Sequence, residues 1–295
     1  MIIRPLAPAD VDAVAEADFA ALQDVALRHG VTPVVRAVHE SRANVRRLLA
    51  ADPLGGFVAE DGGRVVGHAW VHPRGPIATI GPIAVEPACQ RRGIGRALLA
   101  QCLQLPGSRA TQTRLVHESF NTASLNLYFS EGFRIVAPIL ELTLDPETPA
   151  PARAAPPSVT IRAAAAADQQ RIVARDARTF GTSRPQDVER YLRSARALVA
   201  ERGKTLAGFA LGGFGTLGSA AGDDPELVLA MLAALAADPT LRTSALRVMV
   251  LGTDRVLLDG LRAIGFQVFR ACHYMVRGGG TAPPAGYVLM GGDYM

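Results

Sequence analysis

The sequence has few cysteines and no long run of apolar residues. Its only cysteines are Cys89, Cys102 and Cys272, and no two of them form a Cys-x-x-Cys pair. This scatter excludes a disulfide framework and a cysteine zinc site, and it favours reduced thiols in a cytoplasm. No apolar stretch approaches the roughly 20 residues that span a bilayer, and the first residues contain no signal-peptide core. We therefore expect a cytoplasmic protein without a membrane partner.

Aromatic residues and lysine are also scarce, and neither sign of charge dominates. Aromatic residues make up 5% of the chain, Lys204 is the only lysine, and the net charge is +4. The basic residues are dispersed, so we expect no nucleic-acid partner, although a mild positive balance favours an anionic cofactor. No group of histidine, cysteine or acidic residues has metal-ligand spacing, which predicts that no metal is bound.

What the chain does contain is a strand, a glycine-rich turn and a helix start in immediate succession. Residues 80–85 form a short apolar run, Glu86-Pro87 ends it, and Gln90 to Gly95 lead into a helix from Arg96. The first N–H groups of a helix have no internal partner, and the helix dipole adds positive charge there. Glycine at 93 and 95 lets an anion approach the backbone closely. The order predicts an anion site, although a lone Gly-x-Gly also occurs where a helix only packs closely.

Two other phosphate-binding patterns do not fit this segment. A dinucleotide fold would require Gly-x-Gly-x-x-Gly, but Leu98 stands at the third glycine position, and the usual acidic residue is missing from the next strand end. A Walker P-loop would require Gly-Lys followed by Ser or Thr, which is absent here.

The longer pattern resembles the acetyl-CoA signature of the GNAT (GCN5-related) N-acetyltransferases, Arg/Gln-x-x-Gly-x-Gly/Ala. Gln90 begins it, five residues after the strand end at Val85. A second resemblance follows about 30 residues later, where Asn121 and Tyr128 stand at the positions of the family's CoA-side Asn and its general-acid Tyr. The resemblance implies an α/β fold, an α+β mixed central sheet flanked by helices.

The resemblance also implies how a cofactor would bind. Acetyl-CoA would lie in the splay between residues 80–85 and 113–119, with its pantetheine arm on the strand backbone and its pyrophosphate on the glycine-rich turn. The cofactor-binding residues implied are Ile83, Ala84, Val85, Gln90, Arg91, Arg92, Gly93, Ile94, Gly95, Arg96 and Asn121.

For the proton steps, Tyr128 is the expected general acid, or else a tyrosine packed on the CoA arm. Glu118 and His117 are candidate bases, but they point to opposite faces of a strand, so at most one faces the acceptor. We favour Glu118, and a water chain without a dedicated base is the alternative.

The second half repeats the first without its chemistry. Residues 145–158 contain five prolines and read as a semi-rigid linker. After it, residues 198–208 align without gaps on residues 57–67, which argues for a duplicated domain. Asp223 and Asp224 stand where the anion-binding turn would be and would repel pyrophosphate. We predict a catalytic domain over 1–145, a linker over 146–158 and a degenerate GNAT-like domain over 159–295.

The sequence thus predicts an N-acetyltransferase that moves an acetyl group from acetyl-CoA to a primary amine of a small molecule. A CoA-binding sensor or partner module without transfer activity and an enzyme using another acyl-CoA are the alternatives. Mycothiol synthase, a tandem GNAT protein, is disfavoured because its active domain is the C-terminal one. The amine acceptor stays unidentified, and a homodimer stays open.

Overall fold

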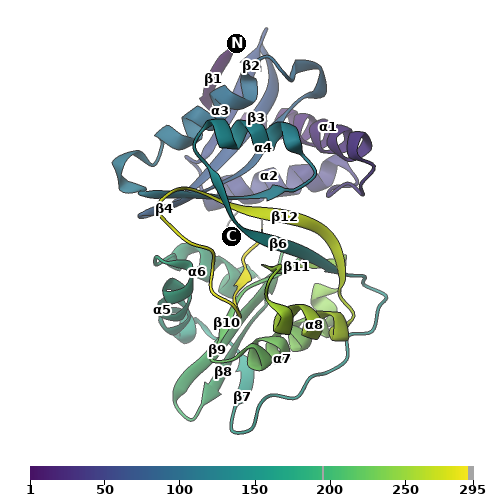
Figure 1. The fold of residues 1–295 in the computed structure, drawn as a ribbon, viewed down its shortest axis with the longest axis vertical. Coiled ribbons are helices and arrows are strands. Elements are labelled where there is room, and N and C mark those ends of the chain that lie inside the picture. Colours follow the sequence, from purple (N-terminus) through teal and green to yellow (C-terminus); the bar gives the residue numbers. More distant parts are fainter. Residues whose placement is uncertain (195, 292–295) are drawn as a thin grey trace. The chain divides into compact units, whose positions relative to one another are not determined.

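The computed structural model describes residues 1–194 and 196–291, which form two compact units (Figure 1). The first unit comprises residues 1–115, 120–134 and 277–279, and the second comprises residues 116–119, 135–276 and 280–295. Each unit therefore contains short segments that are distant in sequence from its main part. Within the described residues, no helix is long and apolar enough to cross a membrane.

The first unit is built on a sheet with the strand order β1-β2-β3-β4-β5. Neighbouring strands are antiparallel except β4 and β5, which are parallel. The strands are β1 (Ile2–Pro5), β2 (Gly56–Asp61), β3 (Arg64–Arg74), β4 (Ile77–Val85) and β5 (Gln112–Glu118), of which the last begins in this unit.

Helices cover both faces of this sheet (Figure 1). Helices α1 (Val11–His29) and α2 (Val38–Ala51) pack on each other, and α1 lies against β3 and β4. Helix α3 (Ile94–Gln104) packs on β2, β3 and β4, and α4 (Thr122–Ser130) follows β5. Gly30 ends α1 in the left-handed conformation, at a φ of 63°, which glycine adopts at little cost.

The second unit has the strand order β12-β6-β11-β13-β10-β9-β8-β7. Its strands are β6 (Arg134–Leu144), β7 (Thr160–Ala163), β8 (Arg196–Arg202), β9 (Thr205–Gly213), β10 (Thr216–Gly222), β11 (Leu246–Leu251), β12 (Gln267–Gly278) and β13 (Val288–Leu289). Its helices are α5 (Gln169–Phe180), α6 (Pro185–Ser194), α7 (Pro225–Ala236) and α8 (Arg255–Ile264).

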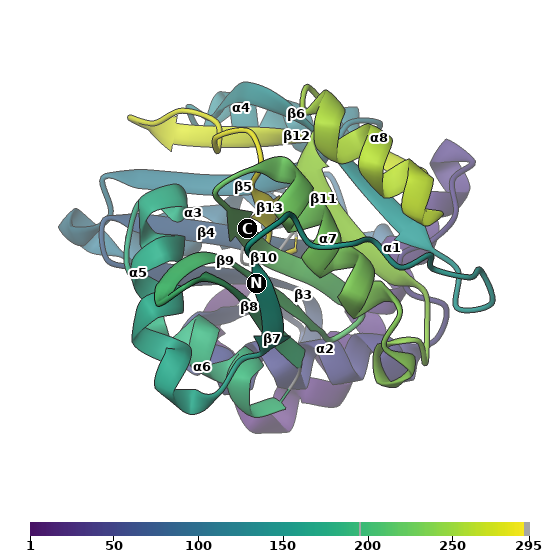
Figure 2. The ribbon, with the colours of Figure 1, turned by 90° about the horizontal axis from the view of Figure 1, so that it is seen from below.

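Helix α7 forms the centre of the second unit's core. It contacts β8, β9, β10 and α8 (Figure 2). The side chains from Leu227 to Ala233 are all buried. The corresponding α3 buries only Ile94, Leu98, Leu99 and Cys102, on one face. Short 3-10 turns complete the two units: η1 (Pro8–Asp10), η2 (Pro87–Cys89), η3 (Gly107–Arg109), η4 (Ala166–Asp168) and η5 (Pro239–Leu241).

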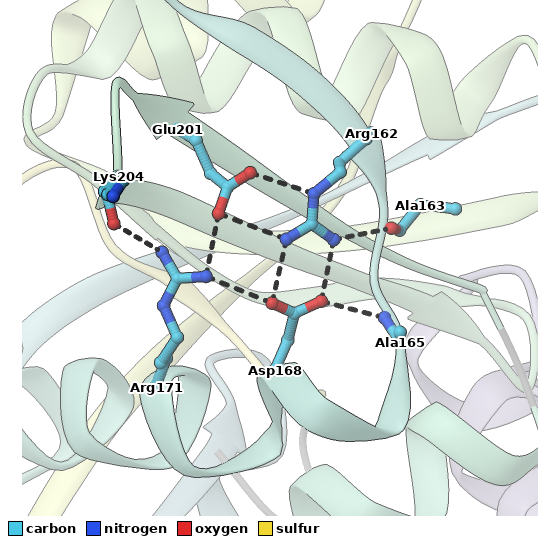
Figure 3. A network of polar contacts seen from close by, with 7 residues as sticks. All are labelled: Arg162, Ala163, Ala165, Asp168, Arg171, Glu201 and Lys204. Atoms are coloured by element: carbon cyan, nitrogen blue, oxygen red, sulfur yellow. Dashed lines mark hydrogen bonds and ion pairs between the residues drawn. The ribbon is translucent and has the colours of Figure 1, made fainter.

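One polar network recurs in both repeats. In the second, Arg162 donates to Asp168 at 2.7 and 2.9 Å and to Glu201 at 2.9 Å (Figure 3). In the first, Arg4 makes the corresponding bonds to Asp10 at 2.7 and 2.8 Å and to Glu60 at 2.9 Å. The same three residue types therefore tie the first strand to the next helix and strand in each repeat, as a duplicated mixed α/β fold requires.

Candidate functional site

Strand β4 has an open edge. Its parallel pairing with β5 runs from Ile77 opposite Gln112 to Thr79 opposite Arg114, whereas its pairing with β3 continues to Val85. Among the described residues, no ladder pair covers the β5 side of β4 after Thr79. Backbone groups of the segment Ile83–Val85 that point away from β3 can therefore pair with an extended ligand as an added strand would.

The turn after β4 leads into a helix whose first turn has no side-chain cap. Gly93 is the N-cap of α3 at a φ of 82°, and a Cβ there would meet nothing within 4 Å. The Gln90 amide donates to the Val85 carbonyl at 3.0 Å, which fixes the turn to the end of β4. The first N–H groups of α3, at Ile94, Gly95 and Arg96, are thus presented at an open surface suited to an anion.

The three arginines of this turn differ in their surroundings. Arg91 is exposed and, among the described residues, has no hydrogen bond or ion pair. Arg92 donates to Asp61 at 2.8 Å, and this bond lowers the pKa of the Asp61 carboxyl. Arg96 pairs with Glu131. Two of the three expected phosphate ligands therefore already have carboxylate partners, and Arg91 is the one that a phosphate would reach directly.

Helix α4 contains Tyr128 and begins after its N-cap Asn121, and it belongs to the same unit as the glycine-rich turn at the start of α3. Asn121 is the N-cap of α4, and its side chain accepts from the Ser124 N–H at 3.3 Å. A Cβ placed on Gly95 would lie 3.6 Å from Leu127 Cδ2, so α4 packs on the start of α3. The Tyr128 ring meets Phe133 edge to face, with centroids 5.8 Å apart.

The environment of Tyr128 fixes its protonation state. Burial raises the pKa of the Tyr128 hydroxyl above its ordinary value, and the nearby Cys102 thiol adds to the rise. The hydroxyl therefore holds its proton at neutral pH, so it can donate a proton but cannot serve as a resident base.

Glu118 and His117 belong to the second unit. Arg270 forms an ion pair with Glu118, and its Nε lies 3.0 Å from a Glu141 carboxylate oxygen. His117 is buried and stacks on His273, with centroids 5.9 Å apart. The structure thus assigns the cofactor-binding candidates and Tyr128 to the first unit, and both candidate bases to the second.

Two buried polar networks of the first unit escaped the sequence analysis. His68 lies 3.1 Å from Asp18, which also accepts from Ser41 at 2.6 Å. The strand period places His68 and His72 on one face, but their partners come from α1 and from the end of α2, which no local pattern reveals.

The second network holds the bulged part of β4 in place. The two guanidinium nitrogens of Arg74 donate to Asp52 at 2.8 and 2.9 Å. His72 Nδ1 lies 2.6 Å from Asp52 and its Nε2 lies 3.1 Å from the Gly81 carbonyl oxygen. The His72 ring thereby joins Asp52 to the strand that bears the open edge.

Within residues 1–194 and 196–291, no three or more His, Cys, Asp or Glu side chains are grouped so that they could hold a metal ion. The expectation that no metal is bound stays a prediction.

The sequence was compared with known families and proteins. Residues 23–133 match the model of the acetyltransferase (GNAT) family. Two relatives named mycothiol acetyltransferase, from Thermobispora bispora and Thermomonospora curvata, are 39% and 36% identical over 90 and 85 residues. Each match covers 28% of this chain, and it spans 30% and 28% of the length of the two relatives. The chain thus matches less than a third of these relatives.

The fold was compared with solved structures. A putative acetyltransferase from Pyrococcus horikoshii has a TM-score of 0.80 at 20% identity and covers 100% of this chain and 95% of its own. A GCN5-related N-acetyltransferase from Sphaerobacter thermophilus has a TM-score of 0.71 at 20% identity, covering 96% of both chains. A tandem GNAT protein from the clavulanic acid biosynthesis pathway has a TM-score of 0.62 at 18% identity, covering 95% of this chain and 99% of its own. Residues 23–133 thus match the GNAT acetyltransferase family, and the fold of the chain is that of GNAT acetyltransferases, a tandem GNAT protein among them.

Proposed function

We propose that the first unit binds acetyl-CoA and transfers its acetyl group directly to a primary amine of a small molecule, within a ternary complex. The observation that carries the proposal is the open edge of β4 at Ile83–Val85, followed by the uncapped start of α3 at Gly93. An extended amide arm fits the strand edge, and a pyrophosphate fits the helix start. Asn121 and the remaining residues of the turn complete the proposed cofactor site.

The chemistry needs two proton transfers. An alkyl amine has a pKa of about 10, so it is mostly ammonium at neutral pH and must lose a proton before it attacks. The leaving thiolate of CoA must gain one. We propose that Tyr128 supplies that proton, because its hydroxyl is protonated at neutral pH and it lies on α4, in the same unit as the proposed cofactor site. An oxyanion at the thioester would be stabilised by a β4 backbone N–H.

The amine must lose its proton to Glu118 or to a chain of water molecules. Glu118 stays our candidate, yet it is the partner of Arg270 and must leave that cation to accept a proton. A water chain would need no such rearrangement. This pairing also supports a second candidate function, a CoA-binding module without transfer activity. Transfer of acetyl groups to any member of a broad amine panel separates the two.

The acceptor and the location of the protein are finer proposals. The relatives are named mycothiol acetyltransferase, but the matched stretch is too short to carry their substrate over to this chain. All three cysteines are free and buried, which supports a cytoplasmic location.

Calorimetric titration with acetyl-CoA tests the cofactor site. We expect one site per chain, and we expect Gly95→Glu to abolish it by placing a carboxylate where the pyrophosphate binds. Gly95→Gln is the matched control, since it adds the same bulk without the charge and should weaken binding less. The proposal fails if wild type does not bind acetyl-CoA, or if the two variants bind as wild type does.

A further inference from the structure

The second unit repeats the splayed strand pair, but its gap is filled. Strands β10 and β11 pair in parallel from Thr216 opposite Arg247 to Leu217 opposite Val248, and then diverge. Strand β13 lies between them: Val288 pairs with Ala220 of β10 and with Val250 of β11, both antiparallel. The edge that is open in the first unit is therefore covered here by the chain's own C-terminal segment.

This segment is buried along its length. Tyr287, Val288, Leu289 and Met290 are each at most 2% exposed. The fit is close at Gly218, where an added Cβ would lie 2.0 Å from the Leu289 carbonyl oxygen. Any residue other than glycine at 218 would push the segment away, so the strand pair is shaped for a backbone at this position.

Polar groups also hold the first residues of the segment, Gly286 and Tyr287. The Gly286 N–H donates to Asp254 at 2.6 Å, and Asp254 is the N-cap of α8, the position that Asn121 has on α4. The Tyr287 hydroxyl accepts from Arg184 at 2.7 Å and lies 2.9 Å from Ser219 Oγ, in a cluster that Asp176 completes. At the N-cap position where the first unit has Asn121, a proposed cofactor-binding residue, the second unit thus has a carboxylate that binds a peptide N–H.

The anion end of this slot is closed as well. Asp224 caps α7 by accepting from the Leu227 N–H at 2.8 Å, and Pro225 brings no N–H to the first turn. Asp223, which precedes them, is held by Arg175 at 2.8 Å. Where α3 begins with an uncapped glycine, α7 begins with a bound carboxylate, which disfavours a second anion.

From these contacts we propose that the slot between β10 and β11 is a peptide-binding site whose resident ligand is the segment 286–290. The segment takes the place that acyl-CoA has in the first unit, so the second unit binds an extended peptide instead of a cofactor. The comparison with the first unit rests on the proposed function, but the peptide site itself does not.

The test cuts the segment free after the protein has folded. A protease site is inserted between Thr281 and Ala282, the purified chain is cut, and gel filtration shows whether the C-terminal fragment stays bound. We expect retention for the wild-type segment and release for Leu289→Asp, which puts a charge at a buried ladder position. Ala285→Asp is the matched control, because it places the same charge at an exposed position of the same segment. Loss of the wild-type fragment would overturn the proposal.

Two further measurements keep the result separate from the cofactor question. Hydrogen exchange of the uncut chain should show the Val288 and Leu289 amides exchanging as slowly as those of β10, and exchange as fast as in an unfolded peptide would refute the site. Acetyl-CoA should bind at one site per chain; a second site that survives Gly95→Glu would show that the slot is not closed. A chain that binds no acetyl-CoA but retains its cut fragment would refute only the proposed function.

Discussion

At the scale of single residues, the chain's buried charges sit where two elements must be held together. Asp52 is the clearest case, because it serves Arg74 and His72 at once, and their side chains are 3% and 1% exposed. If the carboxylate were removed, the Arg74 guanidinium would be left without its counter-charge and the His72 ring without its carboxylate partner.

Asp52→Asn should therefore lower the free energy of unfolding by about 3–5 kcal/mol, as is typical when one partner of a buried pair is removed. Urea unfolding measures the change. Asp12→Asn is the matched control, since Asp12 pairs with Arg42 at a side chain that is 70% exposed, and a loss within about 1 kcal/mol is expected there. Equal losses in the two variants would contradict the role of Asp52.

The same carboxyl predicts a pH dependence. Burial alone would raise the pKa of Asp52, but the hydrogen bonds from His72 and Arg74 outweigh it and lower the pKa to about 2. A carboxyl whose pKa is lowered in the folded state stabilises the fold at pH values above its unfolded-state pKa of about 3.9. It loses that effect as the pH falls through its folded-state pKa. The stability gap between wild type and Asp52→Asn should thus be full at pH 5 and shrink between about pH 4 and 2. A gap that stays constant over this range would argue against the pairing.

Tyr128→Phe removes the proposed acid while keeping the ring that packs on Phe133. If the proposed function holds, kcat should fall by about 10²–10⁴-fold with little change in the KM for acetyl-CoA, because general acid catalysis acts on the transition state. Steady-state kinetics with an acceptor from the panel provide the measurement. An unchanged kcat would leave Tyr128 as a packing residue of the CoA arm.

At the scale of elements, the start of α3 differs from the starts of α4, α7 and α8, because its first N–H groups have no side-chain cap. Its cap is a glycine at positive φ, whereas α4, α7 and α8 begin with an Asn or Asp whose side chain accepts from the first turn. A cap side chain that accepts from the first turn of its own helix leaves fewer free N–H groups for a ligand.

Gly93→Ala should cost about 1 kcal/mol of stability, because alanine is strained at a φ of 82°. It should also weaken acetyl-CoA binding by disturbing the turn. Gly107→Ala is the control: its φ is 57°, nothing lies within 4 Å of its Cβ position, and it is remote in sequence from the turn. We expect a similar loss of stability there and no change in affinity, and a parallel loss of affinity in both variants would count against the site.

At the scale of the whole molecule, the compact units interleave in sequence. Residues 277–279 belong to the first unit, where Arg277 donates to the Glu131 carbonyl and the Gly278 carbonyl accepts from Arg134, both at 2.9 Å. Strand β6 belongs almost wholly to the second unit, in which it pairs with β11 along six residues, from Leu246 to Leu251.

A fragment of residues 1–145 should therefore be less stable than the full chain, since it lacks residues 277–279 and leaves β6 without β11. Thermal unfolding of the fragment and of the full chain provides the comparison, with a lower midpoint and exposed apolar surface expected for the fragment. An equally stable and active fragment would show that residues 1–145 form an independent catalytic domain, as the sequence analysis predicts.

Local patterns determined much of this protein. The Asp61-Gly62-Gly63 sequence is typical of a hairpin turn, and it joins β2 to β3. The order of strand, glycine turn and helix predicted an anion site, because such a site needs glycine and free N–H groups at fixed spacing. The α/β fold was implied by the resemblance of this turn, and of Asn121 and Tyr128, to the GNAT pattern. The loss of that turn in the second half was equally visible.

Only the tertiary structure decided which groups meet. His68 meets Asp18 of α1, and His72 meets Asp52 at the end of α2 and the Gly81 carbonyl of β4. Arg270 reaches Glu118 across 152 positions of sequence, and β13 enters the gap between β10 and β11 although only two residues form it. Side-chain pairing over such separations depends on how strands are ordered in a sheet, and strand order is not encoded in any local period. For the same reason, the sequence showed that the second half lacks the glycine-rich turn. It did not show that the segment 286–290 fills the slot between β10 and β11.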